Sequence, residues 1–273
     1  MSEYKEILLT IKKIKKLYGI DISSYDKQYL QKNIERRIKE NQHASIEAYC
    51  AFLEQNREEA LLLSNSLHNN YSKFFRNSHT FSTLEHIVLP NLMHNNKRKE
   101  IRIWSSACAS GQEAYSVAML MEEFVKMYKG KLNYQIFATD QCETQIAKAI
   151  TGNYTLEDLN HVSLKRVKKW FNKKGDKYLI KSALKKKVDF SVFDLFNEKL
   201  KSPPSSVFGH FDIILCANLL FYYNSKNQKK ILTKINYNLE KGGYLITGEC
   251  ERNILNSNGC KEIIPQSAIF RTK

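Results

Sequence analysis

Two carboxylates and an amide stand directly after apolar segments of the chain, where a ligand can be held. Glu113 follows "IRIWSSACASGQ", Asp140 ends "YQIFATD", and Asn218 follows "FDIILCA". An Asp at the end of a buried strand can accept hydrogen bonds from both hydroxyls of a ribose. The alternative for both acids is a helix cap, because Ser110 and Glu143 give them the S-x-x-E type of spacing. That spacing favours the cap for Glu113 and leaves both interpretations of Asp140 open.

The segments around these residues limit the kinds of ligand and acceptor that the site can take. Gly111 lies among small residues just before an expected helix, where backbone N–H groups and the helix dipole face a ligand. The G-x-G-x-x-G fingerprint is missing, so a phosphate cradle is only weakly indicated. The segment "ANLLFYY" places Tyr222 shortly after Asn218, where enzymes that methylate exocyclic amines of bases usually carry a (D/N)-P-P-(Y/F) turn. Its absence argues against a base amino group as acceptor and leaves carboxylate, hydroxyl or carbon acceptors.

Another candidate site lies in the segment "NNYSKFFRN". Phe74 and Phe75 are adjacent there and Arg76 follows them, with Asn70 and Ser72 just before. A helix that only buries one face does not need two neighbouring aromatic residues followed by a cation. We therefore interpret the segment as a junction whose two rings fix it against the parts of the chain on either side.

The elements that must position these residues fall into two parts. Up to about residue 80 the pattern is helical, with helices expected before Gly19, over about 26–41, after Ser45 and over "NREEALLLSNSL". The residues expected to face inward in the first helix are Ile7, Leu8, Ile11, Ile14 and Leu17. Short apolar strands then alternate with helices, from "IRIWSSA" to "AIFRTK". This alternation predicts an α/β domain with a mainly parallel, doubly wound sheet that binds ligands at the carboxyl ends of its strands.

One segment departs from this alternation of strands and helices. The sequence "KYLIKSAL" and the "KKGD" turn before it predict a short β hairpin. We place this hairpin at about residues 172–190, as a small subdomain inserted in a crossover connection of the sheet.

The formal net charge of +15 indicates an anionic partner, such as nucleic acid, a membrane surface or an acidic protein. Lys32, Arg36 and Lys39 recur at i, i+4 and i+7, so they share one face of the second expected helix. Taken alone, such a face is most simply a soluble surface. The functional alternative is a docking face for an acidic helix or a phosphate backbone.

The cysteines and the N-terminal segment bear on the compartment. The six cysteines form no C-x-x-C pair and have no histidine at the spacing of a zinc site, so we expect buried thiols and no metal. The N-terminal segment alternates apolar and charged residues, as an amphipathic helix does and a signal peptide does not. No apolar run is long enough to span a bilayer. We expect a cytoplasmic protein.

Taken in order, these motifs resemble those of the chemotaxis receptor glutamate methyltransferases of the CheR type. "NYSKFFR" is similar to the N-x-T-x-F-F-R motif of that family, and "WSSACASGQEAYSVAML" to its W-S-x-x-x-x-x-G-E-E-P-Y-S-I-A motif. "IERRIKENQHASIEAYCAFL" resembles its small helical domain, and "FATD", "AKAITGNYT", "FDLF", "FDIILCANLLFYYN" and "GGYLITGECE" match its remaining blocks. The resemblance covers nearly the whole chain. It implies a Rossmann-like fold and methyl transfer from S-adenosylmethionine to receptor glutamate side chains, with S-adenosylhomocysteine as the product.

The resemblance also implies roles for residues of this chain. Arg76 and Tyr222 would lie close to the transferred methyl group and orient the acceptor, so we take them as catalytic. Glu113 would hold the methionine moiety of the cofactor, and Asp140 its ribose. The implied cofactor-binding residues are Asn70, Ser72 and Arg76, then Glu113 and Asp140, then Asp194 and Leu195 at the adenine, and Ala217 and Asn218 near the sulfonium.

The chain departs from the family pattern at a few positions. Ser72 stands in place of the usual Thr and keeps the hydroxyl. Gln112 and Ala114 replace a Glu and a Pro of the family loop, and Ala217 replaces an Arg. "GECE" stands where the family has G-x-S-E.

The expected hairpin is short for this family, in some members of which the subdomain grips a peptide at the receptor's C-terminus. We therefore expect direct recognition of the helical bundle of the receptor, led by Lys32, Arg36 and Lys39. The expected partner is the cytoplasmic domain of a chemoreceptor, so the membrane is approached only through the receptor. We expect a monomer and no nucleic-acid partner.

We predict a helical docking domain over 1–68, a linker with the N-x-S-x-F-F-R motif over 69–90, and an S-adenosylmethionine-binding methyltransferase domain over 91–273. Two alternatives remain open. One is a methyltransferase of another acceptor, a nucleic acid or another protein, which the basic charge favours. The other is a cofactor-binding scaffold without turnover, which the departures at Ala217 and Gln112 favour.

Overall fold

The computed structural model describes residues 3–68, 70–95, 100–127, 132–206 and 209–271, which form two compact units. The smaller unit comprises Met1–Asn69 and Phe221–Lys229, and the larger unit comprises Asn70–Leu220 and Lys230–Lys273. Asn69, the first residue of the predicted linker, lies outside the described residues, as do the last two residues of the predicted final strand.

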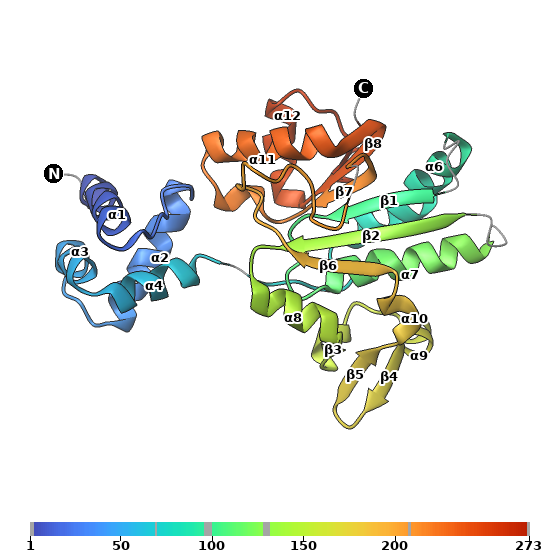
Figure 1. Ribbon diagram of the computed structural model, residues 1–273, viewed down its shortest axis with the longest axis horizontal. Helices are drawn as coiled ribbons and strands as arrows, with labels where there is room; N and C mark the ends of the chain where they lie inside the picture. The colour runs from blue at the N-terminus through green and yellow to red at the C-terminus, as the bar shows by residue number, and fades with distance from the viewer. Residues whose placement is uncertain (1–2, 69, 96–99, 128–131, 207–208, 272–273) are drawn as a thin grey trace. The chain divides into compact units, whose positions relative to one another are not determined.

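The N-terminal part of the smaller unit is helical, as the sequence pattern predicts. Its helices, which Figure 1 shows in blue, are α1 (Glu3–Tyr18), α2 (Lys27–Glu40), α3 (Ile46–Gln55) and α4 (Arg57–Ser66). Side-chain caps set three of the starts, because Asp26, Ser45 and Asn56 each accept backbone N–H groups of the first turn that follows. The predicted N-cap at Ser45 is confirmed.

The buried face of α1 differs in part from the prediction. Ile7, Ile11 and Ile14 are buried, whereas Leu8 and Leu17 are 39% and 57% exposed. At 3.6 residues per turn, Leu8 and Leu17 fall on either side of the stripe formed by the three isoleucines. The prediction from apolar residues at helical spacing therefore made the buried face of α1 too wide.

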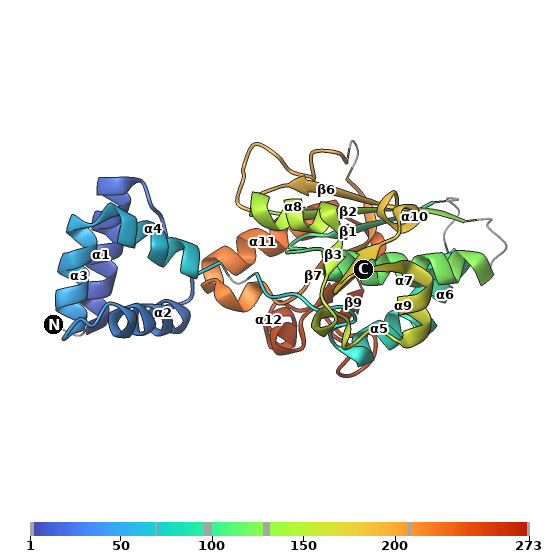
Figure 2. The same cartoon turned by 90° about the horizontal axis from the view of Figure 1, so that it is seen from below.

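The larger unit is built around a six-stranded sheet with the strand order β6-β2-β1-β7-β8-β9 (Figures 1 and 2). The strands are β1 (Glu100–Ser105), β2 (Asn133–Asp140), β6 (Val188–Val192), β7 (Phe211–Cys216), β8 (Leu239–Thr247) and β9 (Ile269–Arg271). Neighbouring strands pair in parallel from β6 to β8, and β9 pairs with β8 in the antiparallel sense. The predicted α/β class with a mainly parallel sheet is confirmed.

Helices connect the strands of this sheet and cover it. They are α5 (Ser78–Thr83), a π-helical turn (Leu84–Val88), α6 (Leu89–Asn95), α7 (Gln112–Met127), α8 (Glu143–Thr151), α11 (Ser225–Asn238) and α12 (Arg252–Ser257). Helices α7 and α8 both pack against β2 and β6. The core includes apolar residues of β1, β2, β7 and β8 together with the buried side of α7.

A second, three-stranded sheet forms the inserted subdomain. Its strands are β3 (Asn153–Tyr154), β4 (Phe171–Lys174) and β5 (Lys177–Ile180), in the order β3-β5-β4. Strands β4 and β5 form the hairpin, whose turn contains Gly175 at a φ of 58°, a left-handed conformation that glycine adopts without strain. Short helices α9 (Leu164–Trp170) and α10 (Ser182–Lys185) flank the hairpin.

Candidate active site

The carboxyl ends of the parallel strands lie along one edge of the sheet. Ser105 is the last residue of β1, Asp140 of β2 and Cys216 of β7. The segments that follow these strands and β6 therefore meet at this edge, where ligands of open α/β sheets bind. The predicted cofactor residues in these segments are Glu113, Asp140, Asp194, Leu195, Ala217 and Asn218.

Glu113 lies at the second position of α7, with its carboxylate at the end of β1. The Ser105 hydroxyl donates a hydrogen bond of 2.6 Å to its Oε1. Because α7 begins at Gln112, Ser110 lies before the N-cap position, and its hydroxyl donates to Oε1 of Gln112 at 2.9 Å. The capping box favoured for Ser110 and Glu113 is therefore wrong, and the carboxylate is turned toward the strand end.

The surroundings of Glu113 shift its acidity. The pKa of Glu113 is raised to about 7, chiefly by burial among protein atoms, and the Glu251 charge contributes to the rise. The Ser105 hydrogen bond and the positive charge of Arg76 act in the opposite direction and lower this pKa. The charge of Arg76 thus acts electrostatically on Glu113, another predicted site residue.

Asp140 joins the loops that follow two neighbouring strands. Its Oδ1 accepts the N–H of Cys142 and its Oδ2 accepts the N–H of Ala109, both at 2.9 Å. The N-cap position of α8 is Cys142, so the alternative interpretation of Asp140 as the cap is wrong. The Asp140 carbonyl also accepts the N–H of Phe193 at 3.0 Å, which holds the segment after β6 beside it.

Left-handed backbone recurs along this edge and in the linker. The residues with positive φ in these segments are Phe75, Asn77, Ala109, Gly111 and Asn218. A Cβ at Gly111 would lie only 2.9 Å from the Cβ of Ala149, so glycine is required there on steric grounds as well. Non-glycine residues in this region of backbone space carry strain, and such strain concentrates at functional sites.

The two adjacent phenylalanines of the linker pack in different directions. The Phe74 ring lies edge-on to Tyr154, with ring centroids 4.8 Å apart. The Phe75 ring lies edge-on to Phe81 at 5.2 Å, and the guanidinium of Arg166 lies 4.6 Å from its centroid. The two directions were predicted, but these contacts all lie inside the larger unit and do not divide between the parts that the linker joins.

The linker is tied to α7 by a hydrogen-bond chain. The N–H of Phe75 donates to Oγ of Ser116 at 2.9 Å, and the Ser116 hydroxyl donates to the carbonyl of Gln112 at 2.7 Å. This connection fixes the residue before Arg76 to the same helix that carries Glu113. Ser116 was not predicted as a site residue, because a serine inside a helix gives no sign of a partner in a distant linker.

The remaining predicted cofactor residues of the larger unit have varied surroundings. Asn70 and Ser72 are half-buried in the linker segment. Asp194 is exposed after β6, and its Oδ1 accepts the N–H of Phe196 at 2.8 Å. Leu195 beside it is buried. Ala217, the departure from the family pattern, is half-buried directly after β7.

Asn218 is held by a residue to which the sequence analysis gave no role. Its N–H donates to Oε2 of Glu251 at 2.8 Å, and its φ is 60°. Glu251 is fully buried and also accepts backbone N–H groups from Leu219, Leu220 and Gly248. The sequence signal was the last Glu of "GECE", but three of its four donors, Asn218 to Leu220, lie about thirty positions earlier and give no local pattern.

Tyr222 belongs to the smaller unit, in the segment Phe221–Lys229. Its carbonyl accepts the N–H of Asp26 at 2.8 Å, and the next residue, Tyr223, forms an antiparallel bridge with Tyr25. The ring of Tyr29 lies 4.8 Å from the ring of Tyr222. The structure thus places the predicted catalytic tyrosine against residues that precede and begin α2.

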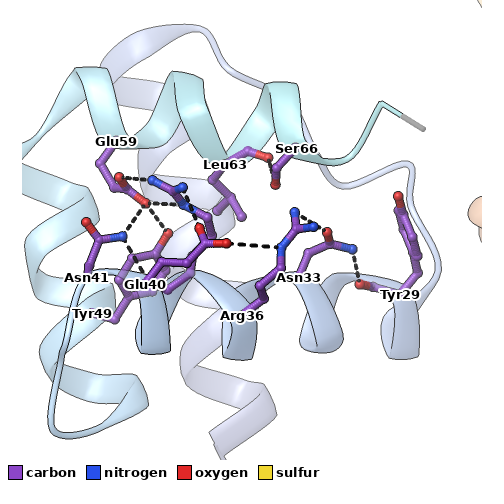
Figure 3. Close-up of polar contacts among 10 residues, drawn as sticks. Tyr29, Asn33, Arg36, Glu40, Asn41, Tyr49, Glu59, Leu63 and Ser66 are labelled. Atoms are coloured by element: carbon purple, nitrogen blue, oxygen red, sulfur yellow. Dashed lines mark hydrogen bonds and ion pairs between the residues drawn. The ribbon is translucent and has the colours of Figure 1, made fainter. Parts of the chain in front are cut away.

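The predicted docking residues Lys32, Arg36 and Lys39 are all exposed on α2. Figure 3 shows that the Arg36 guanidinium is oriented by its own helix: Nη2 donates to Oδ1 of Asn33 at 3.1 Å, and Nε lies 3.8 Å from the carboxylate of Glu40. Part of the positive charge on this face is therefore balanced locally.

Among the described residues, no helix has both the length and the apolar character that crossing a membrane requires.

Comparison with protein families gives two matches in chain order. Residues 5–67 match the family described as CheR methyltransferase, all-alpha domain. Residues 70–269 match the CheR methyltransferase, SAM binding domain. Among solved structures, PKMT2 from Rickettsia typhi is similar at 18% identity and a TM-score of 0.38, over 64% of this chain and 26% of that chain.

Relatives of known name are similar over most of the chain. The chemotaxis protein methyltransferase 1 of Pseudomonas aeruginosa is 32% identical over 87% of this chain and 86% of its own length. The chemotaxis protein methyltransferase of Borreliella burgdorferi is 30% identical, with 90% of this chain and 87% of the relative covered. Cher2 of Pseudomonas putida is 35% identical over 67% of this chain and 66% of its own length. The chain therefore belongs to the CheR methyltransferase family and is an S-adenosylmethionine-dependent methyltransferase.

Proposed function

We propose that the protein transfers methyl groups from S-adenosylmethionine to glutamate side chains in the cytoplasmic helices of a chemoreceptor, and that it acts in the cytoplasm. The proposal rests on the match of residues 5–67 and 70–269, in this order, to the two CheR domain families. Relatives that are similar over most of the chain are named chemotaxis protein methyltransferases. The receptor, the glutamate acceptor and the compartment are the parts that this proposal adds.

The residues at the sheet edge fit the cofactor chemically. Glu113 supplies a carboxylate for the ammonium group of the methionine moiety. Asp140 is held by two backbone N–H groups, and its carboxylate is the kind of acceptor that ribose hydroxyls need. The Asp194 carboxylate suits the amino group of adenine. These assignments follow the family pattern, and the acceptor chemistry of the three acids supports them.

The proposed acceptor needs orientation more than activation. A glutamate carboxylate has a reference pKa of about 4.3, so it is ionised at neutral pH without a general base. When bound, S-adenosylmethionine supplies an electrophilic methyl group on a positively charged sulfur. The task left to the chain is to align the acceptor behind that group and to exclude water, and proximity then provides much of the rate.

Arg76 is the residue that we assign to orienting the acceptor carboxylate, together with the hydroxyl of Tyr222. Its guanidinium has the planar fork that matches a carboxylate. The acceptor's charge is neutralised as the reaction proceeds, so the site must not stabilise that charge more strongly in the ground state than in the transition state. Glu113 near Arg76 weakens the field of the guanidinium when it is ionised. This balance supports a positioning function for Arg76.

The docking face of α2 is the part of the proposal that selects the receptor. Lys32, Arg36 and Lys39 present positive charge on a rigid helix, which suits the acidic surface of a helical bundle. Most of that attraction is long-ranged and is screened by salt, so it acts chiefly on association.

Methyl transfer followed by mild base tests the proposed chemistry. The full chain is incubated with methyl-labelled S-adenosylmethionine and purified receptor cytoplasmic domains, and the labelled receptor is then exposed to base. Carboxylate methyl esters hydrolyse under base, whereas N-methyl groups do not. We expect a base-labile label on the receptor that Arg76→Ala abolishes. A base-stable label, or a label that appears on RNA in a parallel reaction and not on the receptor, would overturn the proposal.

A further inference from the structure

We infer that Glu251 is a positioning residue that fixes the backbone of Asn218–Leu220 and thereby the part of the cofactor site that follows β7. The inference rests on the proposed contact of Asn218 with the cofactor. It goes beyond that contact, because Glu251 itself is assigned no contact with cofactor or acceptor.

The geometry around Glu251 is that of a complete set of hydrogen bonds. Its Oε1 accepts the N–H groups of Leu219 and Leu220, both at 2.6 Å. Its Oε2 accepts the N–H groups of Asn218 at 2.8 Å and Gly248 at 2.7 Å. A carboxylate has about four lone-pair sites, so these donors use its whole capacity.

Because Glu251 is buried, losing its hydrogen bonds would cost the loops much of their stability. Glu251 has no exposed surface, and burial raises its pKa while the four N–H donors act against that shift. A buried carboxylate is tolerated only where hydrogen bonds replace its hydration, and each buried N–H that loses its acceptor costs about 1–3 kcal/mol. The loops after β7 and β8 therefore depend on one side chain for several of their hydrogen bonds.

One of the residues that donates to Glu251, Asn218, has a left-handed backbone conformation. Its φ is 60°, a conformation that Asn adopts more readily than most residues but at a greater cost in free energy than glycine. Three consecutive N–H groups, from Asn218 to Leu220, point at one carboxylate only while this turn is kept. We conclude that Glu251 holds Asn218 in a conformation that the loop alone does not favour.

The side chain of Asn218 lies close to the backbone of Gly248. A Cβ added at Gly248 would lie 2.4 Å from Nδ2 of Asn218 and 2.9 Å from Oε2 of Glu251. Gly248 itself has a φ of −74°, a conformation open to any residue, so its need for glycine is steric. The bare backbone at Gly248 thus leaves room for the Asn218 amide to lie directly over it.

Two variants test the inference. Glu251→Gln keeps the size of the side chain but turns one acceptor oxygen into an NH₂ group that faces backbone N–H donors. Gly248→Ala retains the carboxylate and pushes directly on the Asn218 amide. The matched control is Glu249→Gln, which removes an exposed carboxylate from the same 3-10 turn, Glu249–Glu251.

The readout is the affinity for S-adenosylmethionine and S-adenosylhomocysteine, measured by titration calorimetry on protein whose circular dichroism shows it to be folded. We expect Glu251→Gln and Gly248→Ala each to weaken binding about tenfold or more, and Glu249→Gln to change it less than about twofold. Binding needs no acceptor, so this result is independent of whether a chemoreceptor glutamate is the substrate.

A cycle with Asn218→Ala separates positioning from a purely structural role. If Glu251 acts through Asn218, the loss of affinity in Glu251→Gln/Asn218→Ala should fall clearly short of the two single losses combined. Native affinity in folded Glu251→Gln, or fully additive losses, would overturn the inference. Should Glu251→Gln fail to fold, Glu251→Asp decides, because it keeps the charge but withdraws the acceptor oxygens from the N–H groups of Asn218–Leu220: weakened binding supports the inference and native binding contradicts it.

Discussion

The ring of Tyr29 lies 4.8 Å from the ring of Tyr222, at an interplanar angle of 55°. The Tyr29 hydroxyl donates to the carbonyl of Leu67 at 2.9 Å, so this ring is fixed at its far end. Within the same unit the N–H of Asp26, the N-cap of α2, donates to the Tyr222 carbonyl. The proposed catalytic tyrosine is therefore held by the helix that carries the proposed receptor-docking face.

Removing the Tyr29 ring should lower turnover without affecting the cofactor. In Tyr29→Ala the Tyr222 ring loses one of the rings packed against it, and a small displacement of a reacting group can cost about tenfold to a hundredfold in rate. We expect kcat for receptor methylation to fall in that range, with S-adenosylmethionine affinity unchanged. Tyr29→Phe keeps the ring and is the control. Equal kcat values in Tyr29→Ala and the wild type would refute the positioning role of Tyr29.

Arg76→Ala should reduce kcat by about a hundredfold or more, because it removes the group assigned to orient the acceptor. Arg76→Lys keeps the charge but not the planar fork, so it should recover only part of the rate. Initial rates with saturating cofactor and receptor provide the comparison. A near-native rate in Arg76→Ala would show that our role for this residue is wrong.

Cofactor affinity should depend on pH through Glu113. Burial raises the pKa of Glu113 to about 7, while the Ser105 hydroxyl and Arg76 lower it and Glu251 raises it. The ionised carboxylate is the form that binds the cofactor's ammonium group, so affinity should rise as the pH increases through about 7. It should fall again above the α-amino pKa of about 7.7–8.0, where that ammonium loses its proton.

Calorimetric titrations between about pH 6 and pH 9 measure this dependence, because that range brackets the Glu113 pKa of about 7 and the α-amino reference pKa of about 7.7–8.0. Glu113→Gln should bind more weakly and should lose the rise on the acid side. A wild-type affinity that is flat across this range would contradict the binding role of Glu113.

Reversing the charge of the α2 face should impair receptor recognition alone. In a variant with Lys32, Arg36 and Lys39 all changed to Glu, we expect kcat/KM for the receptor to fall about tenfold or more at low salt, with cofactor affinity preserved. The difference from the wild type should shrink as salt screens the charges. Reversing Lys5, Lys12 and Lys16, which are exposed on α1, is the matched control. An equal loss of kcat/KM in the control, or unchanged receptor affinity in the test variant, would contradict the proposed docking function of this face.

Glu59 should be the residue on which the stability of the helical unit depends most visibly. It is 4% exposed and accepts hydrogen bonds from the Arg37 guanidinium, the Tyr49 hydroxyl and the Asn41 amide (Figure 3). Glu59→Ala leaves these donors without their acceptor, and breaking a buried pair costs about 3–5 kcal/mol. Glu40 pairs with Arg37 at the exposed surface, so Glu40→Ala should cost about 1 kcal/mol or less. Urea unfolding followed by circular dichroism compares the two; similar losses would contradict this ranking.

The fold was predictable because its patterns are local. Apolar strands separated by helices required a parallel sheet, and the end of "YQIFATD" placed Asp140 at its ligand-binding edge. The motif around Arg76 identified the linker, although its direct tie to α7 through Ser116 could not be anticipated. What the sequence carries well is therefore the type and order of elements and the residues at their ends.

The residues that support the site were not predictable from local spacing. The S-x-x-E spacing favoured a capping box for Glu113, but the Ser105 hydroxyl at the end of β1 binds that carboxylate instead. Three of the four N–H groups that bind Glu251 come from residues about thirty positions away, and Tyr222 is held by residues near the start of the chain. Hydrogen bonds between distant segments depend on tertiary packing, which helix or strand propensity and hydrophobic periodicity do not predict.

The central claim is that a receptor glutamate carboxylate is the methyl acceptor. Mass-spectrometric mapping of receptor cytoplasmic domains after reaction with the full chain and S-adenosylmethionine tests it most directly, with Arg76→Ala as the inactive reference. We expect single methyl groups on glutamate side chains of the receptor helices, absent with Arg76→Ala and removed by mild base. Methyl groups mapped to lysine, arginine or histidine, or a receptor left unmodified while another acceptor is methylated, would contradict it.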